Sequence, residues 1–308
     1  MYLEHFHLRE QPFSITPDTS YFFQHQAHQE AMNVLLISLE QGEGFIKITG
    51  EVGTGKTLLC RKLLNHLSEQ AEYVTAYIPN PNMSPSALNH ALADELCIEA
   101  TARTGQHKLF KLINDRLIEL ARDDKKVILC IDESQAMPEQ TLEALRLLSN
   151  LETEKSKLLQ IVLFGQPELN NVLARESIRQ LRQRISFSYQ LAPLDRQSVR
   201  SYIRHRLMIA GYAGNDLFTP AACDVLFKIS NGVPRIINIL AHKAMLVAYG
   251  KGQQTIKKRY VRMAAADTDE TSQRTHRSFA FFRRAALSAL SVMMLAGLGI
   301  YSYAGPLS

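Results

Sequence analysis

One eight-residue stretch constrains the fold of this chain more than any other feature. It reads Gly50-Glu51-Val52-Gly53-Thr54-Gly55-Lys56-Thr57, which fits the pattern G-x-x-x-x-G-K-[ST]. A strand-like apolar run, Phe45 to Thr49, precedes it, and a helix-like run, Leu58 to Leu67, follows it. Glycines let such a loop curl with its N–H groups pointing inward, where the N-terminus of the helix adds partial positive charge. The pattern therefore predicts a phosphate-binding loop between a strand and a helix.

We expect all eight residues of this loop to bind a nucleotide, ATP, together with Mg²⁺. Lys56 would neutralise charge on the β- and γ-phosphates. The hydroxyl of Thr57 would occupy one position on Mg²⁺, because that ion prefers oxygen ligands and keeps several waters.

A second acidic motif follows another buried strand. The apolar run from Val127 to Ile131 ends in Asp132 and Glu133, at the edge of a parallel sheet where ligands bind. We expect Asp132 to join Thr57 on Mg²⁺ and Glu133 to polarise the attacking water. Adjacent carboxylates after a strand also cap helices. The phosphate loop upstream favours the catalytic interpretation, and the sequence predicts Mg²⁺-dependent ATP hydrolysis.

Strand-like and helix-like segments alternate through the first two thirds of the chain, which predicts a parallel sheet with helices on both faces. Ala192 and Pro193 close the last strand, because proline cannot donate to a ladder. We therefore expect an α/β nucleotide-binding core over residues 1–192. The five strand-like runs are Phe45 to Thr49, Tyr73 to Ile78, Val127 to Ile131, Leu158 to Phe164 and Ile185 to Leu191.

Four helix-like segments without a strand signal follow the core and predict a small all-helical second domain over residues 193–266. A polar, basic linker over residues 267–284 would come next. The helix-like segments are Asp195 to Ala210, Pro220 to Ser230, Val233 to Tyr249 and Thr255 to Ala265.

The four cysteines show neither C-x-x-C nor His-rich spacing, so we expect reduced, buried thiols without a disulfide framework or structural zinc. They are Cys60, Cys97, Cys130 and Cys223.

The net charge of +5 is not spread evenly along the 308 residues. Residues 251–284 hold nine basic and three acidic side chains, so the first 250 residues are near neutral. A protein that follows duplex phosphates with its main domain would carry the excess there, which makes nucleic acid an improbable partner.

Residues 285–308 carry no charge. The stretch 285–304 is about long enough to cross a bilayer, and basic residues just before it would stay on the cytoplasmic side. We therefore expect a transmembrane helix over 285–304 in the inner membrane, with the ATPase domain in the cytoplasm. A buried or interfacial terminal helix is the alternative. Gly297, Gly299 and the lack of a strongly polar face argue against it.

The order of a phosphate-loop core and a helical lid resembles the AAA+ ATPases over residues 1–265, and most closely the ExeA (GspA) family of secretion ATPases. Besides the two motifs above, the resemblance is carried by Tyr2-Leu3-Glu4-His5-Phe6, by Gln11-Pro12-Phe13-Ser14-Ile15-Thr16-Pro17, by Asp132-Glu133-Ser134-Gln135 and by Phe164-Gly165-Gln166-Pro167-Glu168-Leu169.

The resemblance implies further roles. Gln166 would sense the γ-phosphate, or serve only as a capping amide. Arg184, or Arg182 nearly as well, would complete the site of a neighbouring subunit, unless it is a solvated surface charge. Arg235 would contact the γ-phosphate from the lid, or be a helix-N-terminal arginine without a ligand. Phe13 would pack either near the base or in the core.

The resemblance also implies function: a membrane-anchored ATPase that drives assembly of a type IV pilus of the MSHA kind, or of a secretion machine. Its partners would be assembly proteins and further copies or homologous subunits. ExeA-like members carry a further cell-wall-binding domain, and here the sequence ends at Ser308, so we expect partner proteins to act in the envelope. The alternatives are a DNA-dependent, transposition-type regulatory ATPase that uses Lys257 to Arg262, and a non-hydrolysing nucleotide-gated scaffold.

Overall fold

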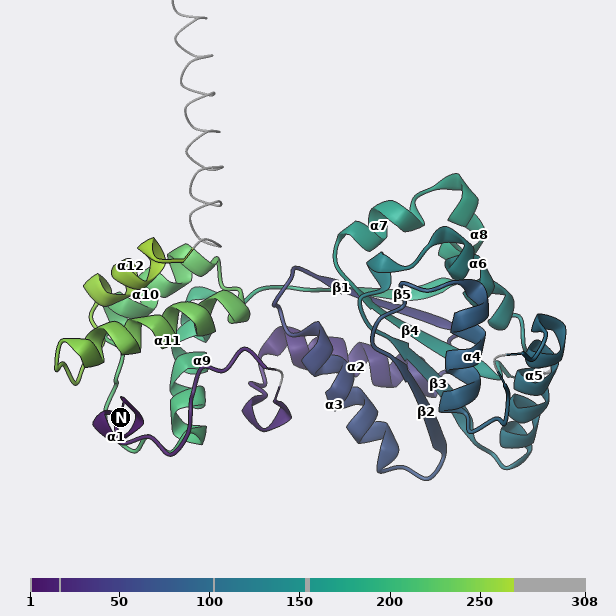
Figure 1. Cartoon of the computed structure of the whole chain (residues 1–308), viewed down its shortest axis with the longest axis horizontal. Coiled ribbons are helices and arrows are strands. Elements are labelled where there is room, and N and C mark those ends of the chain that lie inside the picture. The colour runs from purple at the N-terminus through teal and green to yellow at the C-terminus, as the bar shows by residue number, and fades with distance from the viewer. Residues whose placement is uncertain (1, 17, 102, 153–155, 269–308) are drawn as a thin grey trace, which may run out of the picture.

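The strand that leads into the phosphate loop lies inside a five-stranded sheet. A computed structural model describes residues 2–16, 18–101, 103–152 and 156–268 (Figure 1). The strand order is β2-β3-β4-β1-β5, and all pairings are parallel. The five predicted strands are confirmed within one residue at each end: β1 Phe45–Gly50, β2 Tyr73–Ile78, β3 Lys126–Ile131, β4 Leu159–Gly165 and β5 Ile185–Leu191.

Parallel pairing brings the carboxyl ends of the strands to one edge of the sheet. In register, Thr49 of β1 lies opposite Gly165 of β4, and Ile131 of β3 lies opposite Leu163 of β4. The phosphate loop, the acidic pair after β3 and Gln166 after β4 therefore start from the same edge.

Helices cover both faces of the sheet, as predicted. On one face, Ile128 and Cys130 of β3 pack with α2 (Gln26–Glu40) and α3 (Lys56–Ser68). The alternate residues of β3 face the other layer, so strands buried on both faces read as continuous apolar runs. That layer holds α4 Pro85–Glu95, α5 Gln106–Arg122 and α6 Glu139–Leu148. Shorter helices complete the core: η2 Ser134–Ala136, α7 Glu168–Leu173, η3 Glu176–Ile178 and α8 Arg179–Arg182. The short helix η1 (Thr19–Tyr21) instead places Tyr21 in the hydrophobic cluster of the lid.

The lid follows β5 and forms a lobe of four helices. They are α9 Arg196–Ile209, α10 Pro220–Ser230, α11 Pro234–Gly250 and α12 Lys258–Ala266. Side-chain caps begin α9 at Asp195 and α10 at Thr219, where Pro220 also suits the first helical position. Residues 193–268 contain no strand, only an isolated bridge between Phe218 and Ile256.

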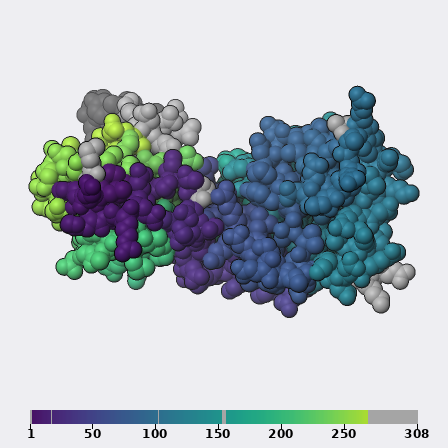
Figure 2. All heavy atoms as spheres, turned by 60° about the horizontal axis from the view of Figure 1, so that its bottom comes forward, coloured from purple at the N-terminus to yellow at the C-terminus, as the bar shows by residue number. Residues whose placement is uncertain are grey.

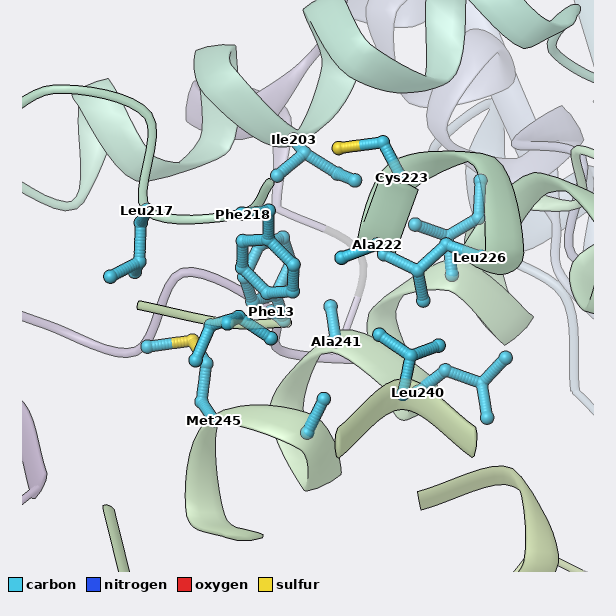
Figure 3. Packing of buried hydrophobic residues seen from close by; sticks show 14 of the residues in the cluster. Phe13, Ile203, Leu217, Phe218, Ala222, Cys223, Leu226, Leu240, Ala241 and Met245 are labelled. Carbon is cyan, nitrogen blue, oxygen red and sulfur yellow. The ribbon is translucent and has the colours of Figure 1, made fainter. Parts of the chain in front are cut away.

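The N-terminal segment packs on the lid, although the sequence assigns it to the core unit. After α1 (Tyr2–His5), the chain contributes Phe6, Leu8 and Phe13 to the hydrophobic cluster of α9 to α12, and its residues cover the lid lobe (Figure 2). Phe13 packs edge-on against Phe218 (Figure 3). Phe13 was expected to pack either near the base of the nucleotide or in the core, and in the structure it is buried in the apolar interior of the lid. The segment lacks a periodic pattern that would reveal which lobe supplies its apolar partners.

Two further predictions concern cysteines and the membrane. Cys60, Cys130 and Cys223 are buried as predicted, but Cys97 is exposed because it lies in the turn after α4 at φ 55°. Within the described ranges, no helix has both the length and the apolar character needed to cross a bilayer. The predicted transmembrane helix at 285–304 and most of the linker lie outside those ranges.

Candidate functional site

The phosphate loop closes between β1 and α3 with two residues in the left-handed region. Gly53 and Gly55 have φ values of 81° and 99°, which glycine adopts without steric cost. The Thr54 hydroxyl donates to the carbonyl of Glu51 at 2.9 Å and fixes the curl. The result is a concave nest of backbone N–H groups at the start of α3 that suits a polyphosphate.

The Lys56 ammonium lies inside this loop. Its side chain is buried, and Nζ donates to the carbonyl oxygens of Gly50 at 2.8 Å and Glu51 at 3.0 Å. Burial lowers the pKa of Lys56, while Glu133 and Asp132 oppose that shift. A cation held mainly by carbonyl dipoles fits an anionic ligand that adds full negative charge.

The loop and the acidic motif meet directly. The Thr57 hydroxyl donates to Asp132 Oδ2 at 2.6 Å, and the Glu133 N–H donates to Asp132 Oδ1 at 2.9 Å. Burial raises the pKa of the Asp132 carboxyl. Two oxygen ligands at one point fit Mg²⁺, which completes its shell with water and phosphate oxygens. Among the residues described, no group of three or more His, Cys, Asp or Glu could hold a metal ion.

Two amides hold the carboxylate of Glu133. Gln135 Nε2 donates to Glu133 Oε2 at 2.5 Å, and Gln166 Nε2 donates to the same oxygen at 3.0 Å. Gln135 Oε1 also accepts from the Gln166 N–H at 2.9 Å, so Gln135 ties the ends of β3 and β4 together. The structure thus brings Gln166 and Glu133 together at the edge of the sheet. No role for Gln135 was predicted from the sequence.

The lid reaches the loop through the start of α11. The Arg235 N–H donates to the carbonyl of Gly53 at 3.3 Å. A Cβ on Gly53 would lie only 2.5 Å from the Cβ of Arg235. A pocket of about 210 Å³ opens between the loop and the lid. Its lining includes Lys56, Thr57, Glu133, Arg235 and the N-terminal residues Ser14 to Thr16.

A buried arginine that the sequence analysis missed also lines this pocket. Arg206 of α9 is 6% exposed, and its guanidinium donates to the carbonyl of Pro12 at 2.5 Å and to the Tyr202 hydroxyl at 3.0 Å. Asn238 of α11 donates to the carbonyl of Ser14 at 3.1 Å and accepts from Tyr202 at 2.8 Å. These bonds fasten the N-terminal segment to the lid. The sequence carries no signal for this attachment.

A buried histidine supports the loop from behind. His28 Nε2 is hydrogen-bonded to the carbonyl of Thr54 at 3.2 Å. A Cβ on Gly55 would lie 2.9 Å from the same ring nitrogen. Burial lowers the pKa of His28 to about 4, so the ring is neutral at physiological pH. The sequence offers no signal for this contact.

Arg184 lies apart from these residues. Its Nη1 donates to the Ser149 hydroxyl at 2.9 Å, where α6 ends, and it does not line the pocket. Arg182 is exposed. Neither arginine meets the phosphate loop of its own chain in the described structure, so a role would require a second subunit.

Comparison with known proteins agrees with this geometry. Residues 39–173, which contain the phosphate loop, the acidic motif and β4, match the AAA domain family model. Residues 39–173 of this chain therefore form an AAA domain. The chain is 42% identical over 265 residues to general secretion pathway protein A of Aeromonas hydrophila, a match that covers 86% of the chain and 48% of the relative. The predicted resemblance to the ExeA (GspA) family is thereby confirmed. The chain described here spans about half the length of this relative.

Solved structures share the AAA fold at low sequence identity. The Cdc6p protein of Pyrobaculum aerophilum aligns with a TM-score of 0.64 at 18% identity, over 81% of this chain and 70% of its own. The Aeropyrum pernix ORC2 protein, solved as ADPNP–ADP complexes, aligns with a TM-score of 0.60 at 14% identity, over 82% of this chain and 72% of its own. The RuvB branch migration motor of Thermotoga maritima aligns with a TM-score of 0.53 at 16% identity, over 82% of this chain and 73% of its own. These similarities establish the fold alone.

Proposed function

We propose that this AAA domain protein is an inner-membrane ATPase whose cytoplasmic domain couples Mg²⁺-dependent ATP hydrolysis to assembly of a secretion machine or an MSHA-type IV pilus. The observation that carries the proposal is the 2.6 Å bond between Thr57 and Asp132. It joins the phosphate loop to the acidic motif at the sheet edge. The relationship to a secretion pathway protein supports the process.

The residues of the site divide the chemistry among them. The loop 50–57 holds the phosphates, and Lys56 balances their charge. Thr57 and Asp132 would hold Mg²⁺, which supplies charge neutralisation when bound. Glu133 would orient and polarise the attacking water. Gln166 donates to Glu133 and would sense the γ-phosphate.

Movement of the lid would transmit the state of the nucleotide. Arg235 begins α11 against the phosphate loop, so a γ-phosphate that attracts its guanidinium pulls on the whole lid. The linker 267–284 and the transmembrane helix 285–304 would carry this movement to the membrane. Arg184 of a neighbouring subunit would complete the site, which makes activity depend on an oligomer of like or homologous subunits.

Nucleotide-dependent capture of partners tests this function. Full-length chain is extracted from membranes in mild detergent as wild type, Glu133→Gln and Lys56→Ala, each with ATP and Mg²⁺. Glu133→Gln should retain pilus or secretion assembly proteins, because it holds ATP without turnover. Lys56→Ala, which cannot hold the phosphates, should not. Recovery of all three variants from the soluble fraction with no assembly protein attached would contradict the proposal.

A further inference from the structure

A cluster of uncompensated positive charge covers one surface of the lid. Its basic side chains are all exposed, and Met263 lies among them with 46% exposure. Arg259 lies over the Tyr260 ring. The other four basic side chains make no ion pair within the described part of the chain. We call this surface the α12 face; it consists of Lys251, Lys257, Lys258, Arg259, Arg262 and Met263.

Three exposed arginines of α9 are neutralised within the same lobe. On α9, Arg196 and Arg200 both pair with Asp224, and Arg204 pairs with Asp216. The lid thus supplies acidic partners for these three arginines of α9. Among the described residues, no acidic side chain forms an ion pair with a cation of the α12 face.

Local stability does not account for the placement of these cations. Lys257 is the N-cap of α12 without a side-chain cap bond, and Lys258 and Arg259 lie in its first turn. This is the end of a helix where positive charge is unfavourable. The helix is nevertheless firmly seated, because Tyr260, Val261 and Ala264 are buried in the lid cluster. An external anionic surface would offset the unfavourable charge.

We propose that the α12 face binds the anionic headgroups of the bilayer. This inference rests on the proposed membrane anchor, since residues 267–284 would connect α12 to the span at 285–304. Because only these residues would separate α12 from the proposed span, anionic lipid would lie within reach of the face. Each Lys or Arg near such a surface adds to the attraction, and Met263 can insert among the headgroups.

Hydrogen exchange in lipid nanodiscs tests the proposal. Full-length chain is incorporated into discs of phosphatidylcholine alone and into discs that contain one third phosphatidylglycerol. Amides of residues 251–266 should exchange at least threefold more slowly in the anionic discs. The protection should disappear in 0.5 M salt, where charges are screened beyond about 4 Å. It should also disappear in the triple variant Lys257→Glu, Lys258→Glu, Arg262→Glu.

A matched control reverses three exposed basic residues at the far end of the core. The control carries three substitutions on α5, which lies opposite the lid (Figure 1): Lys108→Glu, Lys111→Glu and Arg122→Glu. This variant should keep the lipid-dependent protection of α12.

The outcomes separate the two proposals. Incorporation into discs with equal exchange in both lipids would overturn the headgroup contact but leave the anchor intact. Failure to incorporate at all would overturn the anchor and the contact with it. Protection of α12 by short duplex DNA in neutral discs, but not by anionic lipid, would assign the face to nucleic acid instead.

Discussion

The backbone N–H of Arg235 donates to the carbonyl oxygen of Gly53 at 3.3 Å, so the main lid helix begins on the phosphate loop itself. Only a residue without Cβ permits this approach at Gly53. Leu194 and Gly232 fix the same junction from the lid side, because the Leu194 N–H donates to the Gly232 carbonyl at 2.9 Å. The phosphate loop and the lid are therefore mechanically linked.

Gly53→Ala should weaken ATP binding about tenfold or more, because the new methyl group displaces Arg235 from the loop. Gly42→Ala is the matched control. Gly42 has nearly the same φ of 80° but nothing within 4 Å of an added Cβ. Both variants should lose about 1 kcal/mol of unfolding free energy from the left-handed backbone, and titration with a fluorescent ATP analogue should separate them. Equal affinity in the two variants would contradict the linkage.

Arg235→Ala should lower affinity for ATP more than for ADP, since we expect its guanidinium to contact the γ-phosphate. Loss of a charged hydrogen bond costs about 1.5–3 kcal/mol, or roughly 10- to 100-fold in affinity. Calorimetric titration with both nucleotides measures the difference. An equal loss for ATP and ADP would remove Arg235 from that role.

Arg206→Met should weaken ATP and ADP binding by the same factor. The substitution keeps the side-chain bulk but removes the bonds to Pro12 and Tyr202. The N-terminal segment that lines the pocket would then be released from the lid, whichever nucleotide is bound. Stability should fall by about 1–3 kcal/mol, because the carbonyl of Pro12 loses its buried donor. Discrimination between ATP and ADP in this variant would show that Arg206 acts on the phosphates instead.

Stability should fall as the pH drops from 7.5 to 5, and His28 should account for much of the loss. Burial lowers the pKa of His28 from 6.5 to about 4. The folded state therefore binds fewer protons than the unfolded state between these values. Protonation of His28 in the unfolded state should therefore lower the free energy of unfolding by about 2 kcal/mol at pH 5 relative to pH 7.5. Urea unfolding of His28→Gln at both pH values should show a correspondingly smaller change, and an unchanged pH dependence would contradict this assignment.

Gln135→Ala should lower kcat for ATP hydrolysis with little change in KM. Gln135 donates to Glu133 and accepts from the Gln166 N–H, so its loss disturbs the position of the catalytic carboxylate rather than the phosphate cradle. A positioned general base contributes roughly 100- to 10,000-fold, and a misplaced one should lose part of that. A rise in KM without a fall in kcat would instead place Gln135 in nucleotide binding.

The local fold of the core could be predicted because its signals are local. Continuous apolar runs such as Val127 to Ile131 indicate strands buried on both faces, and the parallel sheet then brings Thr57 and Asp132 to one edge. The strands, both helical layers and the contact between the two motifs follow from that reasoning.

Contacts between segments distant in sequence could not be predicted in the same way. The attachment of Pro12 and Ser14 to Arg206 and Asn238 depends on how the N-terminal segment crosses the lid, and no periodicity encodes that path. His28 supports the loop only because α2 packs beside α3. Burial of a charged or polar side chain against backbone carbonyls leaves no pattern in the sequence.

Turnover by Glu133→Gln in saturating Mg²⁺ and ATP is the sharpest test of ATP hydrolysis at this site. The variant should bind ATP within about threefold of wild type, because the loop, Lys56 and the Thr57–Asp132 contact remain. Its hydrolysis rate should fall at least about 100-fold, since a neutral amide cannot polarise the attacking water. Hydrolysis at the wild-type rate, with binding intact, would contradict the account.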